Sequence, residues 1–305
     1  MQDPRDPSSE PLSIPSGGRI VLPETGLVLG LPNSVYQASD AVSQSQLKVF
    51  RQSPAHFHAK FGQPVPAVFA DAYAGSDEMF AGSLCHCATL EPEAFDLRYL
   101  VGPDVKTRRA KAWTEAVEAN PGRVLITPRQ YAVAQAQAAA LRRVDAVAEI
   151  LVGGQCEVSA FWVDPLTGLR CRCRPDCANS EFGTRLDPLA MLLDVKTTRD
   201  ASRRAVQMTI ARYGYHCQAE WYRRGYAAAS GVPVAGFIFA FVESEYPFAV
   251  SVYELDSEAF GIAGRDNRET LDRLAQCRLA GQWPGYSPEV ETIGLPRWAG
   301  GSGDY

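Results

Sequence analysis

The sequence has 305 residues, of which 46% are hydrophobic and 21% charged, as in an ordinary globular protein. A chain of this length can bury a large core, in one α/β domain or in two smaller ones. Its net charge of −5 excludes a general electrostatic attraction to nucleic acid, so any such binding must come from local basic patches. No apolar leader follows Met1 and no apolar run reaches membrane-spanning length, so we expect a cytoplasmic protein without membrane contact.

The chain has eight cysteines, which we expect to be reduced and to pack as small hydrophobic groups. Cys171, Cys173 and Cys177 have a spacing tighter than that of a zinc knuckle, and no partner pair follows them. Only Cys217 and Cys277 come later in the chain. We therefore expect no iron–sulfur cluster.

Residues 1–34 are rich in proline and glycine and predict a flexible arm. Order is expected to begin near Ser43, because Ser43 and Gln46 fit a capping box at a helix start. Further on, 82–92 reads as a helix closed by a proline. His86 lies on its Gly82 face, and a lone helical histidine is more often a core residue than a ligand.

A basic run precedes Trp113 and a long helix predicted over about 128–147. The run is either a solvated loop or a segment that grips phosphates beside a stacking aromatic side chain. It consists of Lys106, Arg108, Arg109 and Lys111.

The spacing of the apolar residues then changes to the two-residue alternation of strands. It predicts a hairpin, with strands at 156–163 and 169–176 joined by a turn at 164–168. Because side chains alternate along a strand, three arginines share the face of Asp176: Arg170, Arg172 and Arg174. They are either a solvated edge or a path for a polyanion. Asp176 favours the second interpretation.

The apolar run 190–193 leads into Asp194, Val195 and Lys196. On a strand, Asp194 and Lys196 share one face, and Val195 takes the other. Two carboxylates and an ammonium at strand ends suit a hard divalent cation beside a scissile phosphate. The polar insertion at 179–188 makes the spacing from Asp176 to Asp194 long, but as a hairpin loop it should not move the site.

The remaining elements are a loop at 197–204 that carries Arg199, a helix through Tyr213 to about Ala229, strands at 234–243 and 249–255, and a helix over about 257–280. A tail rich in proline and glycine follows from 281. On the first of these helices, Gln218 and Tyr222 are four residues apart and face the same way.

Five signals occur in a fixed order: Gly-x3-His at 82–86, Glu157 opening a strand, Pro-Asp at 175–176, Asp-x-Lys at 194–196 and Gln-x3-Tyr at 218–222. The series resembles the PD-(D/E)XK nuclease superfamily, in particular its RecB-like branch. It is most similar to the exonuclease VIII (RecE-type) C-terminal nuclease of phages and prophages. The resemblance extends to Ser43–Leu47, to 53–56 and to the Thr-Thr after Lys196, and covers residues 35–298 as one domain, with 299–305 as a tail.

The resemblance implies an α/β, restriction-endonuclease-like mixed central sheet flanked by helices. It also implies Mg²⁺-dependent 5′→3′ digestion of linear duplex DNA, with Mn²⁺ as a substitute. The metal ligands would be His86, Asp176, Asp194 and the Val195 carbonyl. The catalytic group would be Lys196 with Asp176 and Asp194, assisted by Glu157, Gln218 and Tyr222. The DNA contacts expected from the basic residues are Lys106, Arg108, Arg109, Lys111, Arg170, Arg172, Arg174 and Arg199.

Relatives of this kind leave 3′ single-stranded tails for annealing-type recombination. The resemblance therefore implies double-stranded DNA ends and a RecT-like single-strand annealing protein as partners, a ring-shaped homo-oligomer, and a phage or prophage gene expressed in a bacterial cytoplasm. Two other hypotheses stay open. The chain could be another PD-(D/E)XK DNA nuclease, either an endonuclease or a helicase-associated enzyme, or a non-catalytic scaffold that binds DNA ends.

Overall fold

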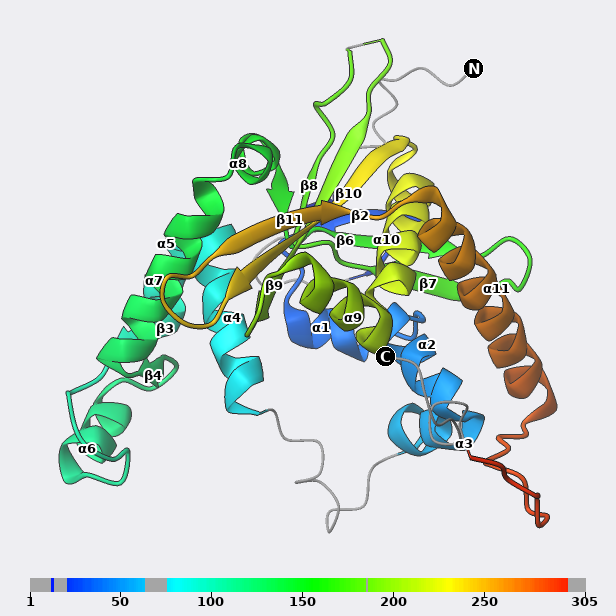
Figure 1. The fold of residues 1–305 in the computed structure, drawn as a ribbon, viewed down its shortest axis with the longest axis horizontal. Coiled ribbons are helices and arrows are strands. Elements are labelled where there is room, and N and C mark those ends of the chain that lie inside the picture. The colour runs from blue at the N-terminus through cyan, green and yellow to red at the C-terminus, as the bar shows by residue number, and fades with distance from the viewer. Residues whose placement is uncertain (1–11, 14–20, 64–75, 185, 296–305) are drawn as a thin grey trace, which may run out of the picture.

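The computed structural model describes residues 12–13, 21–63, 76–184 and 186–295, and shows a single α/β domain in which helices flank a mixed sheet (Figure 1). This confirms the predicted fold class. Within the described residues, no helix combines the length and apolar character needed to cross a bilayer.

The central sheet has the strand order β11-β10-β9-β8-β5. β9 and β10 pair in parallel, and the other three neighbouring pairs are antiparallel. The five strands are β5 (Gln155–Cys156), β8 (Cys177–Asn179), β9 (Ala190–Thr198), β10 (Val234–Glu243) and β11 (Val250–Glu254). β9 therefore pairs with β10 on one side and with β8 on the other, and lies in the centre of the sheet.

A second sheet has the order β1-β2-β6-β7, and β3 pairs with β4 in a two-stranded ladder. These strands are β1 (Leu12–Ser13), β2 (Gly26–Leu29), β6 (Ser159–Val163), β7 (Arg170–Cys173), β3 (Tyr99–Val101) and β4 (Val124–Ile126). The predicted strand 169–176 is therefore divided between the sheets: β7 ends at Cys173, and β8 starts after Asp176.

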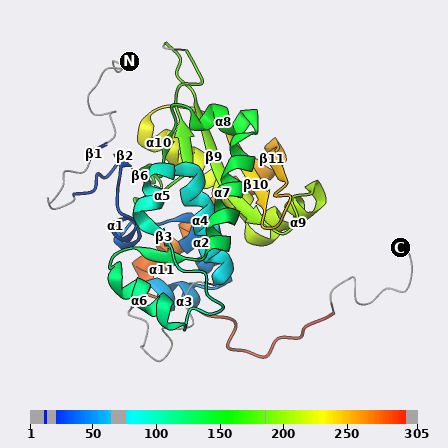
Figure 2. The same ribbon diagram turned by 90° about the vertical axis from the view of Figure 1, so that its left-hand side faces the viewer.

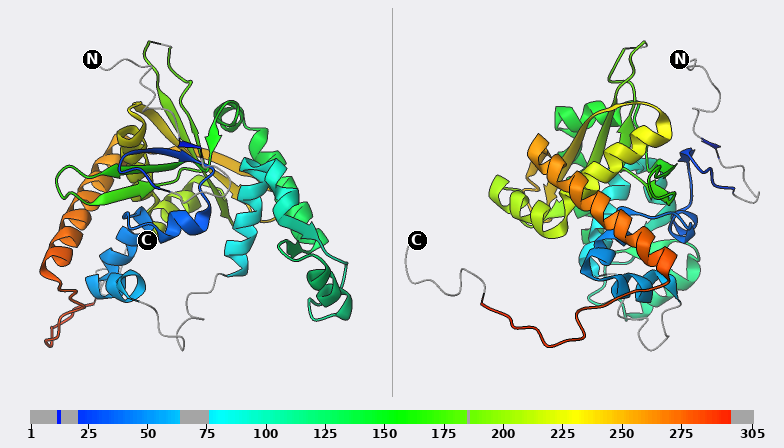
Figure 3. Two further views of the ribbon diagram at one scale, coloured as in Figure 1. Left: turned by 180° about the vertical axis from the view of Figure 1, so that it is seen from behind. Right: turned by 90° about the vertical axis from the view of Figure 1, so that its right-hand side faces the viewer.

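Helices cover both sides of the central sheet, as Figures 1 and 2 show. On one side lie α4 (Asp77–Leu90), α5 (Pro92–Arg98), α6 (Lys111–Ala119), α7 (Pro128–Arg142) and α8 (Asp145–Leu151). The others are α1 (Asn33–Ala38), α2 (Gln44–Gln52), α3 (Pro54–Phe57), the π-helical turn η2 (His58–Gly62), α9 (Arg203–Tyr213), α10 (Tyr215–Ser230) and α11 (Ser257–Ala280). Figure 3, seen from behind, shows α11 along the flank opposite α7.

Local chemistry explains where several helices begin and end. The predicted capping box is present at α2: the Ser43 hydroxyl accepts from the Gln46 amide, and the Gln46 side chain accepts from the Ser43 amide. Gly214 has a left-handed φ of 69°, which ends α9 and starts α10. The single helix predicted to run through Tyr213 to about Ala229 therefore consists of two helices. The first of them, α9, begins inside the loop predicted at 197–204.

The core lies between the two sheets and α10. Trp162 and Trp221 pack with ring centroids 5.1 Å apart, and a side chain at Gly225 would overlap Trp162. Cys171, Cys173 and Cys177 are fully buried in this apolar interior, which confirms that they pack as small hydrophobic groups.

Regular structure begins earlier than predicted. β2 pairs with β6, and α1 follows it, so 26–34 contributes to the domain and not only to an arm. Of the predicted arm, 1–11 and 14–20 lie outside the described residues, as does the predicted tail 299–305.

Candidate active site

The second half of β9 supplies the acidic and basic centre of the site. Leu193 and Val195 face the helices α4 and α8 in a dry cluster, while Asp194 and Lys196 take the opposite face. Asp194 is 1% exposed and forms an ion pair with Lys196. Burial lowers the pKa of Lys196, but Asp194 and Asp176 raise it by more, so the net shift is upward and the ammonium stays charged.

Asp176 lies where the chain crosses from one sheet to the other. Its Oδ2 accepts a hydrogen bond of 2.6 Å from the Val195 amide, so it sits beside β9. Burial, and then the charge of Asp194, raise the pKa of Asp176 well above its ordinary range. Two carboxylates in so small a buried space repel each other, and their arrangement favours a counter-charge between them.

His86 projects from α4 toward the same point. Its Nε2 donates to the Val195 carbonyl at 2.7 Å, and its Nδ1 lies 3.4 Å from Asp176 Oδ2. Burial, and then Lys196, lower the pKa of His86, so the ring is neutral. The donating Nε2 assigns the proton to that nitrogen and leaves a lone pair on Nδ1, which faces the carboxylate.

Glu157 completes the cluster from the turn between β5 and β6. Its φ of +55° is unusual for a residue other than glycine, and its amide donates to the Asp176 carbonyl at 3.0 Å. Burial, and then Asp176, raise the pKa of Glu157 to about 7. Strain of this kind on an acidic residue is typical of a functional position.

These groups fit a divalent cation. One ligand atom each from His86, Glu157 and Asp176 lie within 4.8 Å of one another, and two of the three are oxygen donors. A cation between Nδ1 and the carboxylates would satisfy lone pairs that otherwise face each other. The sequence predicted Glu157 only as a support, whereas the geometry places it among the candidate ligands.

Asp194 and the Val195 carbonyl, both predicted ligands, are engaged with other groups in this structure. Asp194 Oδ1 accepts from Gln218 Nε2 at 2.7 Å, and its other oxygen faces Lys196. The Val195 carbonyl accepts from His86. Gln218 on α10 therefore holds this carboxylate in place.

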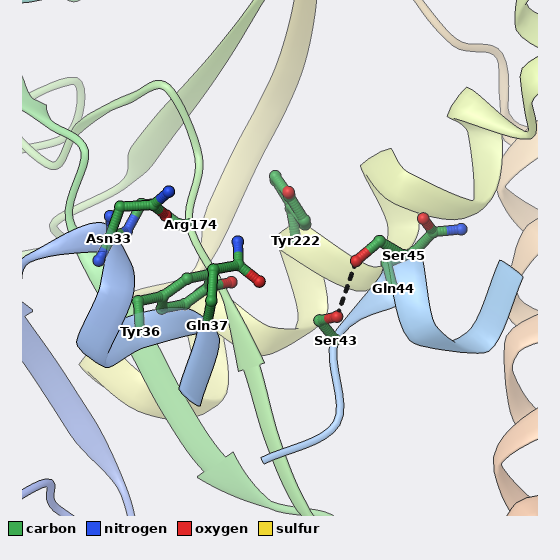
Figure 4. A pocket seen from close by; sticks show the side chains of 8 residues that line it. All are labelled: Asn33, Tyr36, Gln37, Ser43, Gln44, Ser45, Arg174 and Tyr222. Atoms are coloured by element: carbon green, nitrogen blue, oxygen red, sulfur yellow. Dashed lines mark hydrogen bonds between the residues drawn. The ribbon is translucent and has the colours of Figure 1, made fainter. Parts of the chain in front are cut away.

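Two cavities adjoin the cluster. The larger, of about 900 Å³, is lined by His86, Glu157 and Lys196 together with Met79 and Gly82 of α4. A smaller one of about 170 Å³ is shown in Figure 4 and lies among α1, the start of α2 and α10. Its lining residues are Asn33, Tyr36, Gln37, Ser43, Gln44, Ser45, Arg174 and Tyr222. Asn33 and Arg174 line both cavities, so these two residues lie between them.

The arginines of the β7 segment do not form the single open face that was predicted. Arg172 is 1% exposed, and its guanidinium donates to the Tyr36, Gln37 and Ser39 carbonyls of the α1 region. Its predicted role in DNA binding is wrong for this structure, because α1 covers it. Arg170 is half-buried against Asp40, and only Arg174 opens toward the site.

The predicted DNA contacts of the α6 segment lie away from the cluster (Figure 1). Lys106, Arg108, Arg109 and Lys111 are exposed at the start of α6, which Figure 1 places at the lower end of the α7 flank. Arg108 donates to Gln130 and lies over Trp113. Arg199 follows directly after β9, one residue beyond the Thr-Thr pair that continues from Lys196.

Sequence reasoning missed Tyr36 and Tyr215. The Tyr36 ring lies 4.2 Å from Arg174, and the Tyr215 ring 4.8 Å from Lys196. Tyr215 stands three residues before Gln218 on α10, so helical spacing could have revealed it. Tyr36 left no such signal, because it lies between the predicted arm, which ends at residue 34, and the first predicted helix, which begins near Ser43.

The sequence matches the model of one protein family over residues 43–296, a family described as a PDDEXK-like domain of unknown function (DUF3799). No protein of the curated set matches the chain.

Among solved structures, a protein of Eubacterium rectale that is provisionally named an exonuclease has a TM-score of 0.55 and 12% identity, over 88% of this chain and 97% of that chain. At this identity the likeness is one of fold. The structure of SSO0001 has 15% identity and a TM-score of 0.26, over 48% of this chain and 67% of that chain, which is too low to bear on the fold.

Proposed function

The chain belongs to the PDDEXK-like family and has the PD-(D/E)XK nuclease fold, and from this we propose that it is a 5′→3′ exonuclease on linear double-stranded DNA that depends on a divalent metal. The observation that carries the proposal is the convergence of four elements at one point. α4 supplies His86, the segment before β8 supplies Asp176, β9 supplies Asp194 and Lys196, and the turn before β6 supplies Glu157.

The metal would be held by His86, Asp176 and Glu157, with Asp194 joining when Lys196 turns toward substrate. Oxygen-rich ligation favours Mg²⁺, and the imidazole makes Mn²⁺ a suitable substitute. When bound, the ion would supply an activated water and neutralise charge on the scissile phosphate.

The protein's own groups would do the rest. Lys196 would hydrogen-bond the attacking water and stabilise the charge that develops on the phosphate oxygens. Gln218 would hold Asp194 in place through their hydrogen bond. Arg174 and the hydroxyls of Ser43 and Ser45, which line the smaller cavity, offer donors for a neighbouring phosphate.

Duplex DNA labelled separately at its 5′ and 3′ ends tests the proposal. With Mg²⁺, the wild-type protein should release the 5′ label first and leave closed circles intact. Asp194→Ala should lose cleavage by roughly a thousandfold or more while it still binds DNA, because it removes the acid that holds Lys196. Asp187→Ala, which changes an exposed aspartate of the β8–β9 loop, is the control and should cleave normally.

Each alternative has its own signature in this experiment. Release of the 3′ label first would contradict the 5′→3′ direction, and nicking of closed circles would indicate an endonuclease. Either result would still show that the protein is a nuclease. DNA that stays intact with Mg²⁺ and Mn²⁺ at any protein excess would establish a non-catalytic scaffold instead.

We extend the proposal to the biological setting that the sequence resemblance implied. The 3′ single-stranded tails left by such an enzyme would be the substrate of a RecT-like annealing protein. Processive digestion would suit a ring-shaped homo-oligomer that encloses the duplex. Sedimentation of the purified protein, alone and with DNA, tests the ring.

A further inference from the structure

Two thiols lie directly opposite each other under the candidate metal site. Cys156 is the last residue of β5 and precedes Glu157, while Cys177 is the first residue of β8 and follows Asp176. In the antiparallel ladder between these strands, Cys156 and Cys177 are paired positions. The metal-site acids and the thiols are therefore adjacent rungs of one ladder.

The register places these thiols at a distance that suits a disulfide. The Glu157 amide donates to the Asp176 carbonyl, which marks that rung as a hydrogen-bonded pair. Hydrogen-bonded and non-hydrogen-bonded pairs alternate, so Cys156 and Cys177 form a non-hydrogen-bonded pair, with Cα atoms about 4.5 Å apart. Disulfides span Cα separations of about 4.4–6.8 Å. The Cα separation typical of this pair type therefore lies within the range that a disulfide spans.

The surroundings give the two sulfurs different access. Cys156 is half-buried and lines the larger cavity, whereas Cys177 is fully buried beside Cys85 and Leu193. All eight cysteines are free in this structure.

We propose that Cys156 and Cys177 are a modification site, at which a peroxide-class oxidant forms a disulfide that ties the strand leading into Glu157 to the strand that follows Asp176. β5 is an edge strand of two residues, so little else holds this rung. The bond would act as a staple of the metal-site ladder. The proposal does not depend on nuclease activity.

The chemistry balances with hydrogen peroxide as the oxidant. The Cys156 sulfur, reached through the cavity, attacks one peroxide oxygen; the O–O bond breaks, and sulfenic acid and one water form. The Cys177 sulfur then displaces the hydroxyl from the sulfenic sulfur, and the departing hydroxide takes the Cys177 proton to form a second water. Two thiols are oxidised to one disulfide, and one peroxide is reduced to two waters.

The test treats the folded full-length protein with hydrogen peroxide, blocks the remaining thiols by alkylation and maps the peptides by mass spectrometry. We expect a peptide that links Cys156 to Cys177, and a melting temperature that rises by roughly 5 °C and returns on reduction. Cys156→Ser should lose both effects. Cys277→Ser, which changes another half-buried thiol far from the ladder, should keep both.

Three outcomes would contradict the proposed disulfide. Both thiols could be fully alkylated in oxidised protein that remains folded, or either thiol could be crosslinked to Cys85 instead. The third is a melting temperature that falls on oxidation. If Cys156→Ser does not fold, peptide mapping and the reversible melting shift of the wild-type protein still decide between these results.

Discussion

The basic residues of this protein form two regions that look alike in the sequence and differ in the structure. In the β7 segment, Arg172 is buried and donates to the carbonyls of the α1 region. At the start of α6, Lys106 and Arg109 are exposed. Alternation along a strand identifies which side chains share a face, but it does not tell whether a helix from elsewhere in the chain covers that face. A charge pattern is evidence of a nucleic-acid surface only where the side chains remain in water.

The largest effect should come from the buried region. Arg172→Ala removes the guanidinium that donates to the carbonyls of Tyr36, Gln37 and Ser39, and opens a cavity beside the Tyr36 ring. The Tyr36 carbonyl keeps its bonds from Ser39, so the loss falls mainly on the other two carbonyls. We expect the free energy of unfolding, measured by urea denaturation, to fall by roughly 3 kcal/mol. Arg172→Lys should recover only part of it, because an ammonium cannot span the same acceptors. Unchanged stability would show that water replaces the guanidinium and would remove the distinction between the two regions.

The exposed region should respond in the opposite way. Lys106→Ala combined with Arg109→Ala should leave unfolding unchanged within about 0.5 kcal/mol and weaken duplex binding about tenfold. The slope of log affinity against log salt should decrease by about 1 per lost phosphate contact. Arg265→Ala, at an exposed position of α11, is the matched control and should bind as the wild type does. If the double variant and the control bind equally, the α6 segment is only a solvated loop.

A smaller effect concerns pH, because the acids of the site have raised pKa values. Glu157, at about 7, and Asp176 hold protons more tightly in the folded state than in the unfolded chain. The contribution of Glu157 to stability is therefore complete below its unfolded pKa of about 4.5 and is lost as the pH rises through 7, and Asp176 acts in the same direction. The metal-free protein should melt at a lower temperature at pH 8 than at pH 5.5. Mn²⁺ should reverse the trend, and Glu157→Gln should flatten it.

The smallest effect concerns Arg174, which follows the β7 arginines in the sequence but lies beside Glu157. Its Nη1 lies 3.9 Å from Glu157 Oε2, and its charge lowers the pKa of that carboxyl against the larger effect of burial. Arg174→Gln should move the pH midpoint of Mn²⁺ binding upward by less than about one unit. A calorimetric titration at several pH values measures the shift. A midpoint that does not move would assign Arg174 to the fold alone, like Arg172.

The sequence was informative where the relevant pattern is local. Asp194 and Lys196 share a face because any strand alternates, and Ser43 caps α2 because the capping box lies within four residues. The family resemblance predicted that His86 and Asp176, which lie on elements far apart in the sequence, belong to the same site. What could not be predicted depends on tertiary contacts: the cover of α1 over Arg172, the crossing between sheets at Asp176, and the left-handed turn that brings Glu157 into the cluster. The break at Gly214 was also missed, because a glycine within an apolar helical pattern does not reveal its own φ.

The pairing of β9 with β10 along its whole length has a consequence for how the protein can be altered. The position of Asp194 and Lys196 is fixed by that parallel partner, and not by the tip of the hairpin that joins β8 to β9. The hairpin tip, which contains 180–184 and 186–188 of the insertion predicted at 179–188, can therefore change in length without displacing Asp194 and Lys196. It is a permissive position for an epitope or a fluorescent label, and a place where related chains can diverge freely.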